Sequence, residues 1–166
     1  MMRMVLAGLL GLLAATAQAQ SCDASQPLAA PDGRYRQAGA TVLDKTTGLV
    51  WLRCPLGMSW DGITCTGTVA KYGWQQALQQ ADTSTAAGYS DWRLPNAKEL
   101  TSLVEPACVS PAINLRVFPN TPGEGFCSSS PFVGDANSAW DVSFSNGYVS
   151  NLSRSNYNAV RLVRGG

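Results

Sequence analysis

The sequence predicts an α+β domain, and three observations lead to this class. Apolar residues indicate β-strands near both ends of the chain, as short continuous runs within residues 41–52 and as an alternating pattern within residues 140–152. Two segments between them, residues 74–81 and 96–104, repeat apolar side chains at helical spacing. Five cysteines indicate loops closed by disulfides. Two helices between terminal groups of strands favour α+β over an alternating α/β arrangement.

The first residues are typical of a secretory signal. Arg3 precedes an apolar stretch over residues 5–17, and Ala17-Gln18-Ala19 matches a cleavage site. The stretch is too short to favour a membrane span. We therefore expect a signal peptide over residues 1–19 and an exported, soluble product, periplasmic or extracellular, that begins near Gln20.

The expected mature chain is neutral and of single-domain size. Removing Arg3 from the 12 basic residues leaves 11, which balances the 11 acidic ones. Neutrality argues against a nucleic-acid partner and against binding driven by overall charge. Residues 20–39 contain scattered Pro and Gly without periodicity and are expected to form an extended lead-in. The folded domain is expected over residues 40–166.

The first hairpin is predicted by two apolar runs around a polar turn. Thr41-Val42-Leu43 and the run over residues 49–52 flank residues 44–48, which are polar and end in Gly48. The next segment, residues 53–71, has no periodicity and is expected to be irregular.

Two helices follow. The first is predicted by apolar residues at helical spacing: Trp74, Ala77, Leu78 and Ala81. The second has a polar start, in which Asn96 caps the helix and Glu99 stands three residues later. Its buried face is formed by Leu100, Leu103 and Val104, and Pro106 is expected to end it. In the preceding Trp92-Arg93-Leu94-Pro95 segment we expect a structural role, with Trp92 in the core and Arg93 bound to backbone carbonyls or to Glu99.

The second hairpin is predicted by strict alternation and a turn dipeptide. Trp140, Val142 and Phe144 lie on one face of a strand, and Asn146-Gly147 tolerates the positive φ values of a tight turn. A return strand follows, and residues 159–164 form a final strand. Trp140 is expected to be a core residue, together with Trp51 and Trp74.

The cysteines are expected to be oxidised in an exported chain. Pairing of sequence neighbours gives Cys54 with Cys65 and Cys108 with Cys127, since each pair brackets a loop rich in Gly, Pro or Asn. Cys22 is then left over. It is free, cross-linked to another chain, or part of a mobile leader.

The last part of the chain offers many neutral hydrogen-bonding groups. Amides and hydroxyls suit the hydroxyl groups of a sugar, and a tyrosine ring suits its apolar face. The candidate ligand-binding residues are Asp135, Asn137, Asp141, Asn146, Tyr148, Asn151, Arg154, Asn156, Tyr157 and Asn158. The other interpretation of this surface is a solvated hairpin whose polar residues satisfy turns.

Catalysis has little support in the sequence. The chain contains no histidine, the usual general base and activator of Ser or Cys nucleophiles. Ser128-Ser129-Ser130 therefore lacks an evident partner, and Cys108 and Cys127 lack the close spacing of redox pairs. We expect no enzyme activity and assign no cofactor or metal. Calcium is the one ion considered, because Asp135, Asn137 and Asp141 are oxygen donors, although their spacing is irregular.

Five segments in order resemble the Lcl C-terminal domain family. They are residues 44–51 (DKTTGLVW), 88–100 (GYSDWRLPNAKEL), 128–131 (SSSP), 139–144 (AWDVSF) and 160–164 (VRLVR). The resemblance covers residues 40–164 and implies a compact fold related to C-type lectins and sulfatase-modifying enzymes, with adjacent terminal strands and two flanking helices. The family is expected to carry an aromatic residue at the position of Cys127. The cysteine of this chain departs from that pattern, and a bond to Cys108 would explain the change.

The resemblance also implies a function. The family takes its name from a collagen-like bacterial adhesin that binds sulfated polysaccharides, so we expect an adhesion module that recognises a glycan or a surface protein, with oligomerisation raising avidity. The expected mature chain is neutral, and the sequence contains no collagen-like stalk. One alternative is an envelope structural protein, which an exposed patch around Val117, Phe118, Phe126 and Phe132 would favour. Another is an oxidoreductase-like enzyme on the sulfatase-modifying scaffold, which reduced Cys108 and Cys127 beside a cleft would favour.

Overall fold

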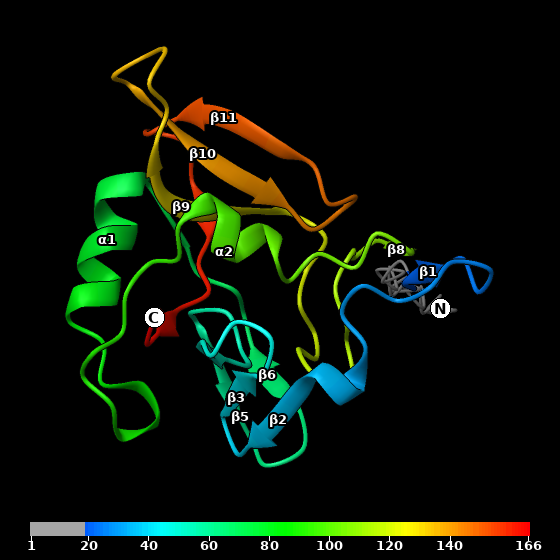
Figure 1. Cartoon of the computed structure of the whole chain (residues 1–166). Coiled ribbons are helices and arrows are strands. Elements are labelled where there is room, and N and C mark those ends of the chain that lie inside the picture. Colours follow the sequence, from blue (N-terminus) through cyan, green and yellow to red (C-terminus); the bar gives the residue numbers. More distant parts are fainter. Residues whose placement is uncertain (1–18) are drawn as a thin grey trace, which may run out of the picture.

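The computed structural model describes residues 19–166, which form an α+β fold, as predicted (Figure 1). Its helices are η1 (Asp32–Arg34), α1 (Trp74–Asp82), η2 (Ala86–Gly88) and α2 (Ala97–Thr101). Its strands are β1 (Ser21–Cys22), β2 (Tyr35–Ala38), β3 (Thr41–Asp44), β4 (Val50–Leu52), β5 (Met58–Trp60), β6 (Cys65–Gly67), β7 (Lys71–Tyr72), β8 (Cys108–Val109), β9 (Gly125–Pro131), β10 (Ser138–Ser143), β11 (Val149–Ser153), β12 (Asn158–Ala159) and β13 (Val163–Arg164). No helix in the described range is long and apolar enough to cross a membrane. The predicted signal segment lies outside the described residues, except for Ala19.

The larger sheet has the strand order β11-β10-β9-β12-β7. The hairpin β10–β11 confirms the prediction from alternation and Asn146-Gly147, and Gly147 has a φ of 81°. Strands β9 and β10 are antiparallel, whereas β12 joins β9 in parallel with Ala159 opposite Phe126. In Figure 1 the strands β9–β11 form the upper part of the molecule.

The second sheet has the order β13-β4-β3-β2. Its hairpin β3–β4 confirms the first predicted hairpin, and β13 pairs with β4 through Val163 and Trp51. The last strand therefore lies beside the first hairpin, as the resemblance implied. Residues 158–164 thus contribute a strand to each sheet.

The final strand differs from the prediction because it is split into β12 and β13. Between them, the Val160 and Leu162 carbonyls accept hydrogen bonds from Leu56 N at 2.9 Å and Leu52 N at 3.0 Å. The extended conformation continues, but its partners are loop and strand-end residues of the N-terminal half. A sequence pattern shows that a segment is extended and buried, and it does not show which backbone groups it pairs with.

Residues 20–39 pack against the domain and do not stand apart as a lead-in. Strand β2 pairs with β3 along its whole length, and β1 pairs with β8. The ring of Tyr35 is buried edge-on against Phe118, with centroids 5.5 Å apart. Arg34 Nε donates to Oδ1 of the buried Asp44 at 2.8 Å, which fixes the chain at the entrance to β2.

Two apolar clusters form the interior, and each helix packs into one of them. The α2 cluster contains Trp51, Leu100, Leu103, Phe118, Phe126, Val142 and Phe144. The α1 cluster contains Leu52, Ala77, Ala81, Trp92, Leu94, Val160 and Leu162. The predicted apolar stripe of α1 is confirmed at Ala77 and Ala81, which are buried, whereas Trp74 and Leu78 are half-buried at its margins.

The start of α2 is held by the predicted capping box. Asn96 Oδ1 accepts from Glu99 N, and Glu99 Oε2 accepts from Asn96 N, both at 2.8 Å. Both oxygens of Glu99 also accept from the Arg93 guanidinium at 2.8 Å, which confirms the structural role predicted for Arg93. The helix ends at Thr101, well before Pro106. Ser102 N is shared between the Lys98 and Glu99 carbonyls, and the next two backbone bonds join residues three apart, which is the tighter 3₁₀ pattern common at helix ends.

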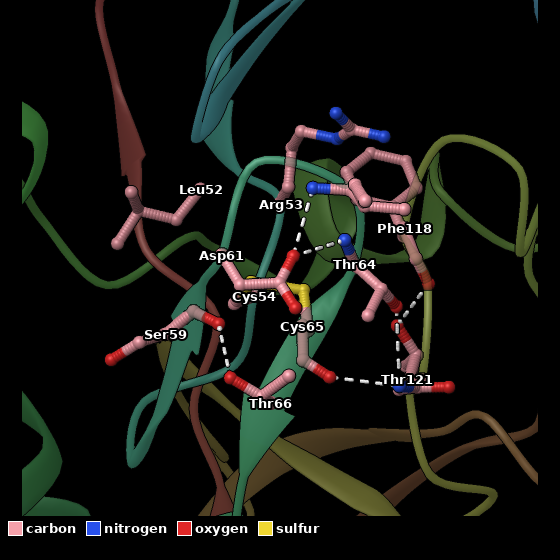
Figure 2. The surroundings of a disulfide bond; sticks show 12 residues. Leu52, Arg53, Cys54, Ser59, Asp61, Thr64, Cys65, Thr66, Phe118 and Thr121 are labelled. Atoms are coloured by element: carbon pink, nitrogen blue, oxygen red, sulfur yellow. Dashed lines mark hydrogen bonds between the residues drawn. A yellow bond between two sulfur atoms is a disulfide. The ribbon is translucent and has the colours of Figure 1, made fainter.

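The disulfides confirm one predicted pair and correct the other. Cys54 and Cys65 are bonded, and Figure 2 shows the loop they close, in which Asp61 Oδ1 accepts from Thr64 N at 2.8 Å. The predicted Cys108–Cys127 bond is wrong, because Cys108 is bonded to Cys22 and Cys127 is reduced. The reason is strand pairing: β1 and β8 place Cys22 directly opposite Cys108, whereas Cys127 lies in the interior of the larger sheet opposite Asp141.

Candidate functional site

The ten predicted ligand-binding residues do not form one surface. Asn146 and Tyr148 lie at the tip of the β10–β11 hairpin, and Asn151 lies in the middle of β11. Asp141, opposite Ser150, also lies in the middle of the hairpin. The remaining residues lie toward the opposite end, which we call the base of the hairpin. The paired segment between tip and base runs from Val142 to Ser138, four residue steps or about 13 Å. One small ligand cannot contact both ends.

At the base, two turns lie side by side. The turn over residues 132–138 and the turn over residues 153–158 are joined by Arg154 N, which donates to Asn137 O at 2.8 Å. The Arg154 side chain adds a bond from Nε to Ser138 O at 3.2 Å. Asp135 accepts from Asn137 N at 3.0 Å and from the Ser138 hydroxyl at 2.7 Å, and these bonds lower its pKa. These bonds connect the two turns into one platform at the base of the hairpin.

Four predicted residues are exposed on this platform. Asp135, Asn137, Asn156 and Tyr157 face solvent, and Tyr157 is 63% exposed. Among the described residues, no hydrogen bond engages the Asn156 amide or the Tyr157 hydroxyl, so both remain free for a ligand. Tyr148 is also exposed, at 73%, but it lies at the tip.

Trp74 is a site residue that the sequence did not reveal. Its indole lies against the Arg154 guanidinium, whose central carbon is 4.1 Å from the ring centroid, and its Nε1 donates to Ser128 O at 2.9 Å. The first residue of α1 is thereby linked to the base of the hairpin. Helical spacing had indicated only a core position, because the pattern contains no information about the arginine that covers the ring.

A narrow crevice lies beneath this contact. It is lined by Trp74, Cys127, Ala139, Trp140, Asp141, Leu152, Ser153, Arg154, Asn156 and Asn158. Its volume of about 10 Å³ admits a single water molecule and nothing larger. The crevice brings together four of the ten predicted residues, but a ligand would have to bind above it and not inside it.

Asp141 was predicted to face solvent, and this is wrong. The side chain is 4% exposed because β10 lies between β9 and β11, which places Cys127 and Ser150 opposite Asp141 on either side. Its Oδ1 accepts from the Ser150 hydroxyl at 2.8 Å. Burial raises the pKa of this carboxyl group. Asp141 is therefore an interior group and does not belong to the exposed platform.

Trp140 also differs from its prediction as a core residue. It is half-buried, borders the crevice and packs edge-on against Phe132, with centroids 5.2 Å apart. Alternation places Trp140 on the same face as the buried Val142, but it lies closer to the base. The alternating pattern identified the correct face of the strand. It did not show how far along that face the core extends.

The reduced cysteine is poorly suited to chemistry. Cys127 is 4% exposed, and burial, with a smaller effect from Asp141, raises its pKa to about 12. Its thiol is therefore protonated at neutral pH, whereas nucleophilic and redox cysteines react as thiolates. The other cysteine of the enzyme hypothesis, Cys108, is in a disulfide.

The serine run has a structural role. Ser128 Oγ donates to Trp140 O at 2.7 Å and accepts from Ser130 N at 3.2 Å. Ser130 Oγ accepts from Ala97 N at 3.0 Å. These bonds stabilise an irregularity in the β9–β10 pairing and attach it to the start of α2.

The oxygen donors considered for calcium are not arranged as one cluster. Asp135 and Asn137 belong to the exposed turn, whereas Asp141 is buried three residues beyond Ser138. In residues 19–166, no three acidic, cysteine or histidine side chains gather in a way that could hold a metal ion.

The residues considered for an assembly surface are enclosed. Val117, Phe118 and Phe126 are wholly buried, and Phe132 is half-buried against Trp140. They form no exposed apolar patch.

Comparison with known proteins places the chain in a family. No curated protein shows significant similarity to it. A family model described as the Lcl C-terminal domain matches residues 40–164, about three quarters of the sequence. The match covers both sheets except β2, both α-helices and the whole hairpin base. The chain therefore belongs to the Lcl C-terminal domain family.

Proposed function

We propose that this chain is an exported, non-catalytic binding module that recognises a glycan, or a surface protein, at the base of the β10–β11 hairpin. The proposal rests on one observation. Asn156 and Tyr157 are exposed there, beside the Arg154–Trp74 contact, and their side chains make no hydrogen bond to another described residue. For a hydroxylated ligand, the Asn156 amide supplies donors and an acceptor, the Arg154 guanidinium supplies donors, and Tyr157 supplies a hydroxyl group and an aromatic ring.

The disulfides support the exported setting. Cys54–Cys65 and Cys22–Cys108 are typical of oxidising compartments such as the periplasm or the cell exterior. The raised pKa of Cys127 supports a role that uses no thiolate. Membership of a family named after an adhesin supports binding as the activity.

The proposal is tested by locating the binding surface. A glycan array and a pull-down from cell envelopes would identify a ligand, and calorimetry would measure its affinity for variants. Asn156→Ala combined with Tyr157→Ala should weaken binding at least tenfold, about 1.4 kcal/mol, because both polar contacts and the ring are removed. Asn146→Ala combined with Tyr148→Ala, at the tip, is the matched control and should leave the affinity unchanged.

Two outcomes would contradict the proposal. If only the tip variant loses binding, the ligand site is at the other end of the hairpin. If the wild-type protein binds no glycan and no surface protein, the assignment as a binding module is wrong.

A further inference from the structure

The outer edge of β11 is an open sheet edge. Strand β11 ends the five-stranded sheet, and no described strand pairs with its outer side. Four of its five residues are exposed, the exception being the half-buried Leu152. In Figure 1 it lies at the top of the molecule with no other strand above it. An open edge presents unpaired backbone groups that can pair with another strand.

The register shows which backbone groups are available. Ser143 N donates to Tyr148 O at 2.8 Å, so these two residues form a hydrogen-bonded pair. Because such pairs alternate along an antiparallel ladder, Ser150 and Leu152 also point their backbone groups toward β10. Val149, Asn151 and Ser153 therefore direct theirs outward. Ser153 O is used by Asn156 N at 2.9 Å, whereas no described group bonds the backbone of Val149 or Asn151 on this side.

This edge lacks the usual protection against pairing. Residues 142–153 contain no charged residue and no proline. Native sheet edges are commonly protected by lysine or another charge, by proline, by a bulge or by shortness. The other sheet edges formed by β7 and β2 are protected in this way: β7 has two residues including Lys71, and β2 contains Arg36.

We propose that β11 is a dimerisation surface, at which β11 of a second copy adds antiparallel about Asn151. In this register Asn151 lies opposite its own copy, Val149 lies opposite Ser153, and Ser150 lies opposite Leu152. No like charges meet, because the edge has none, and the neutral mature chain adds no net repulsion.

A second copy fits this edge better than another strand of the same protein does. Pairing of β11 with itself is two-fold symmetric and closes after two copies, whereas pairing with β2 of a neighbour would be open-ended and would bring in Arg36. The resulting sheet is continuous across the dimer. Five-residue strands bury little surface, so the dimer is weak and concentration-dependent. It does not depend on the ligand proposed above.

The first experiment measures association and its location. Sedimentation velocity of the full chain from micromolar to millimolar concentration should show a monomer that converts to a dimer. Hydrogen exchange at the highest concentration should slow selectively at the amides of Val149 and Asn151. A protein that stays monomeric throughout, or a dimer protected elsewhere, would overturn the proposal.

The second experiment places a charge at the two-fold axis. Asn151→Lys sets two ammonium groups opposite each other and should raise the dimer dissociation constant at least tenfold. Asn146→Lys adds the same charge at the exposed tip, outside the paired segment, and should leave the constant unchanged. Circular dichroism and the unfolding midpoint verify that both variants are folded. Equal effects of the two variants, or no effect of either, would place the interface elsewhere.

Discussion

At the residue scale, the buried side chains of Arg161 and Asp141 differ in how many hydrogen-bond partners their surroundings provide. Arg161 is wholly buried, and no carboxylate in residues 19–166 pairs with it. Its guanidinium donates to the Leu52 carbonyl at 2.8 Å and to the Thr121 hydroxyl at 2.6 Å. It also lies 4.8 Å from the Phe118 ring centroid. Burial lowers its pKa to about 9, so it remains charged at neutral pH. Among the described residues, Asp141 has no cationic partner and only one side-chain donor, Ser150.

The buried carboxyl group of Asp141 predicts a pH-dependent stability change. Because burial raises its pKa, the protonated form is favoured in the folded state, and this stabilisation is lost as the pH rises through the folded pKa. Asp141→Asn keeps an acceptor for Ser150 and removes the charge. It should raise the free energy of unfolding at pH 7 by about 0.5–2 kcal/mol, the usual range of a stabilising substitution.

Urea unfolding at several pH values checks this prediction. The gain should disappear below about pH 4, where the unfolded-state carboxyl group is also protonated. Asp135→Asn is the control and should show no gain at pH 7, since hydrogen bonds lower the pKa of Asp135 and favour its ionised form. An Asp141→Asn effect of the same size at every pH would contradict the electrostatic explanation.

At the element scale, the five-residue helix α2 depends on the contacts at its first turn. Glu99 accepts bonds from Asn96 N and from both terminal nitrogens of Arg93, so one carboxylate joins the helix start to the segment that bridges to β13. A helix this short is not stable alone. Its cap and its packing through Leu100 therefore determine whether it forms.

Glu99→Ala should cost about 1–2 kcal/mol of unfolding free energy, because the cap and the Arg93 contact are lost together. Arg93 lowers the pKa of Glu99, so this contribution is present above the unfolded pKa and is lost as the pH falls through the folded pKa. Denaturant unfolding should therefore show a smaller difference in acid. Lys98→Ala, at the exposed neighbour, should have little effect; an equal loss would show that the cap and the Arg93 contact are not responsible.

At the scale of the whole molecule, the two disulfides close loops of very different length. Cys22–Cys108 spans 86 residues and attaches the N-terminal segment to the region after α2, whereas Cys54–Cys65 spans 11. In the chain-entropy model a cross-link stabilises the fold by limiting the unfolded chain, more so for longer loops. The two bonds therefore should not be equivalent.

Replacing Cys22 and Cys108 by serine should cost about 4–5 kcal/mol, and replacing Cys54 and Cys65 about 3 kcal/mol, by the loop-length relation. Equilibrium unfolding of the two double variants measures the difference. Peptide mapping of the non-reduced protein should recover Cys127 as a free thiol. Recovery of a Cys108–Cys127 peptide, or an equal cost for the two bonds, would contradict the arrangement described here.

Local signals in the sequence predicted local structure well. Asn146-Gly147 and Gly48 identified both hairpins, and the Asn96 to Glu99 spacing identified the cap, because each depends on neighbouring residues. The pairing of Cys22 with Cys108 depends on β1 reaching β8, which no local pattern encodes. The same is true of the parallel addition of β12 to β9.

In the candidate site, too, the sequence predicted the local features and missed those that depend on tertiary contacts. Exposure of Asn156 and Tyr157 followed from turn composition, whereas the burial of Asp141 depends on β9, a strand that no pattern in the sequence identified. The role of Trp74 depends on Arg154, eighty positions later. Alternation shows on which face a side chain lies, and only the tertiary structure shows what covers that face.

The contribution of residues 158–164 to both sheets has a consequence for biosynthesis. The ribosome delivers the N-terminal strands first, yet β12 lies between β9 and β7 while β13 completes the outer side of β4. Neither sheet reaches its final strand order until these late residues emerge. Both sheets are therefore completed only after the last segment of the chain has been synthesised and has joined the two halves.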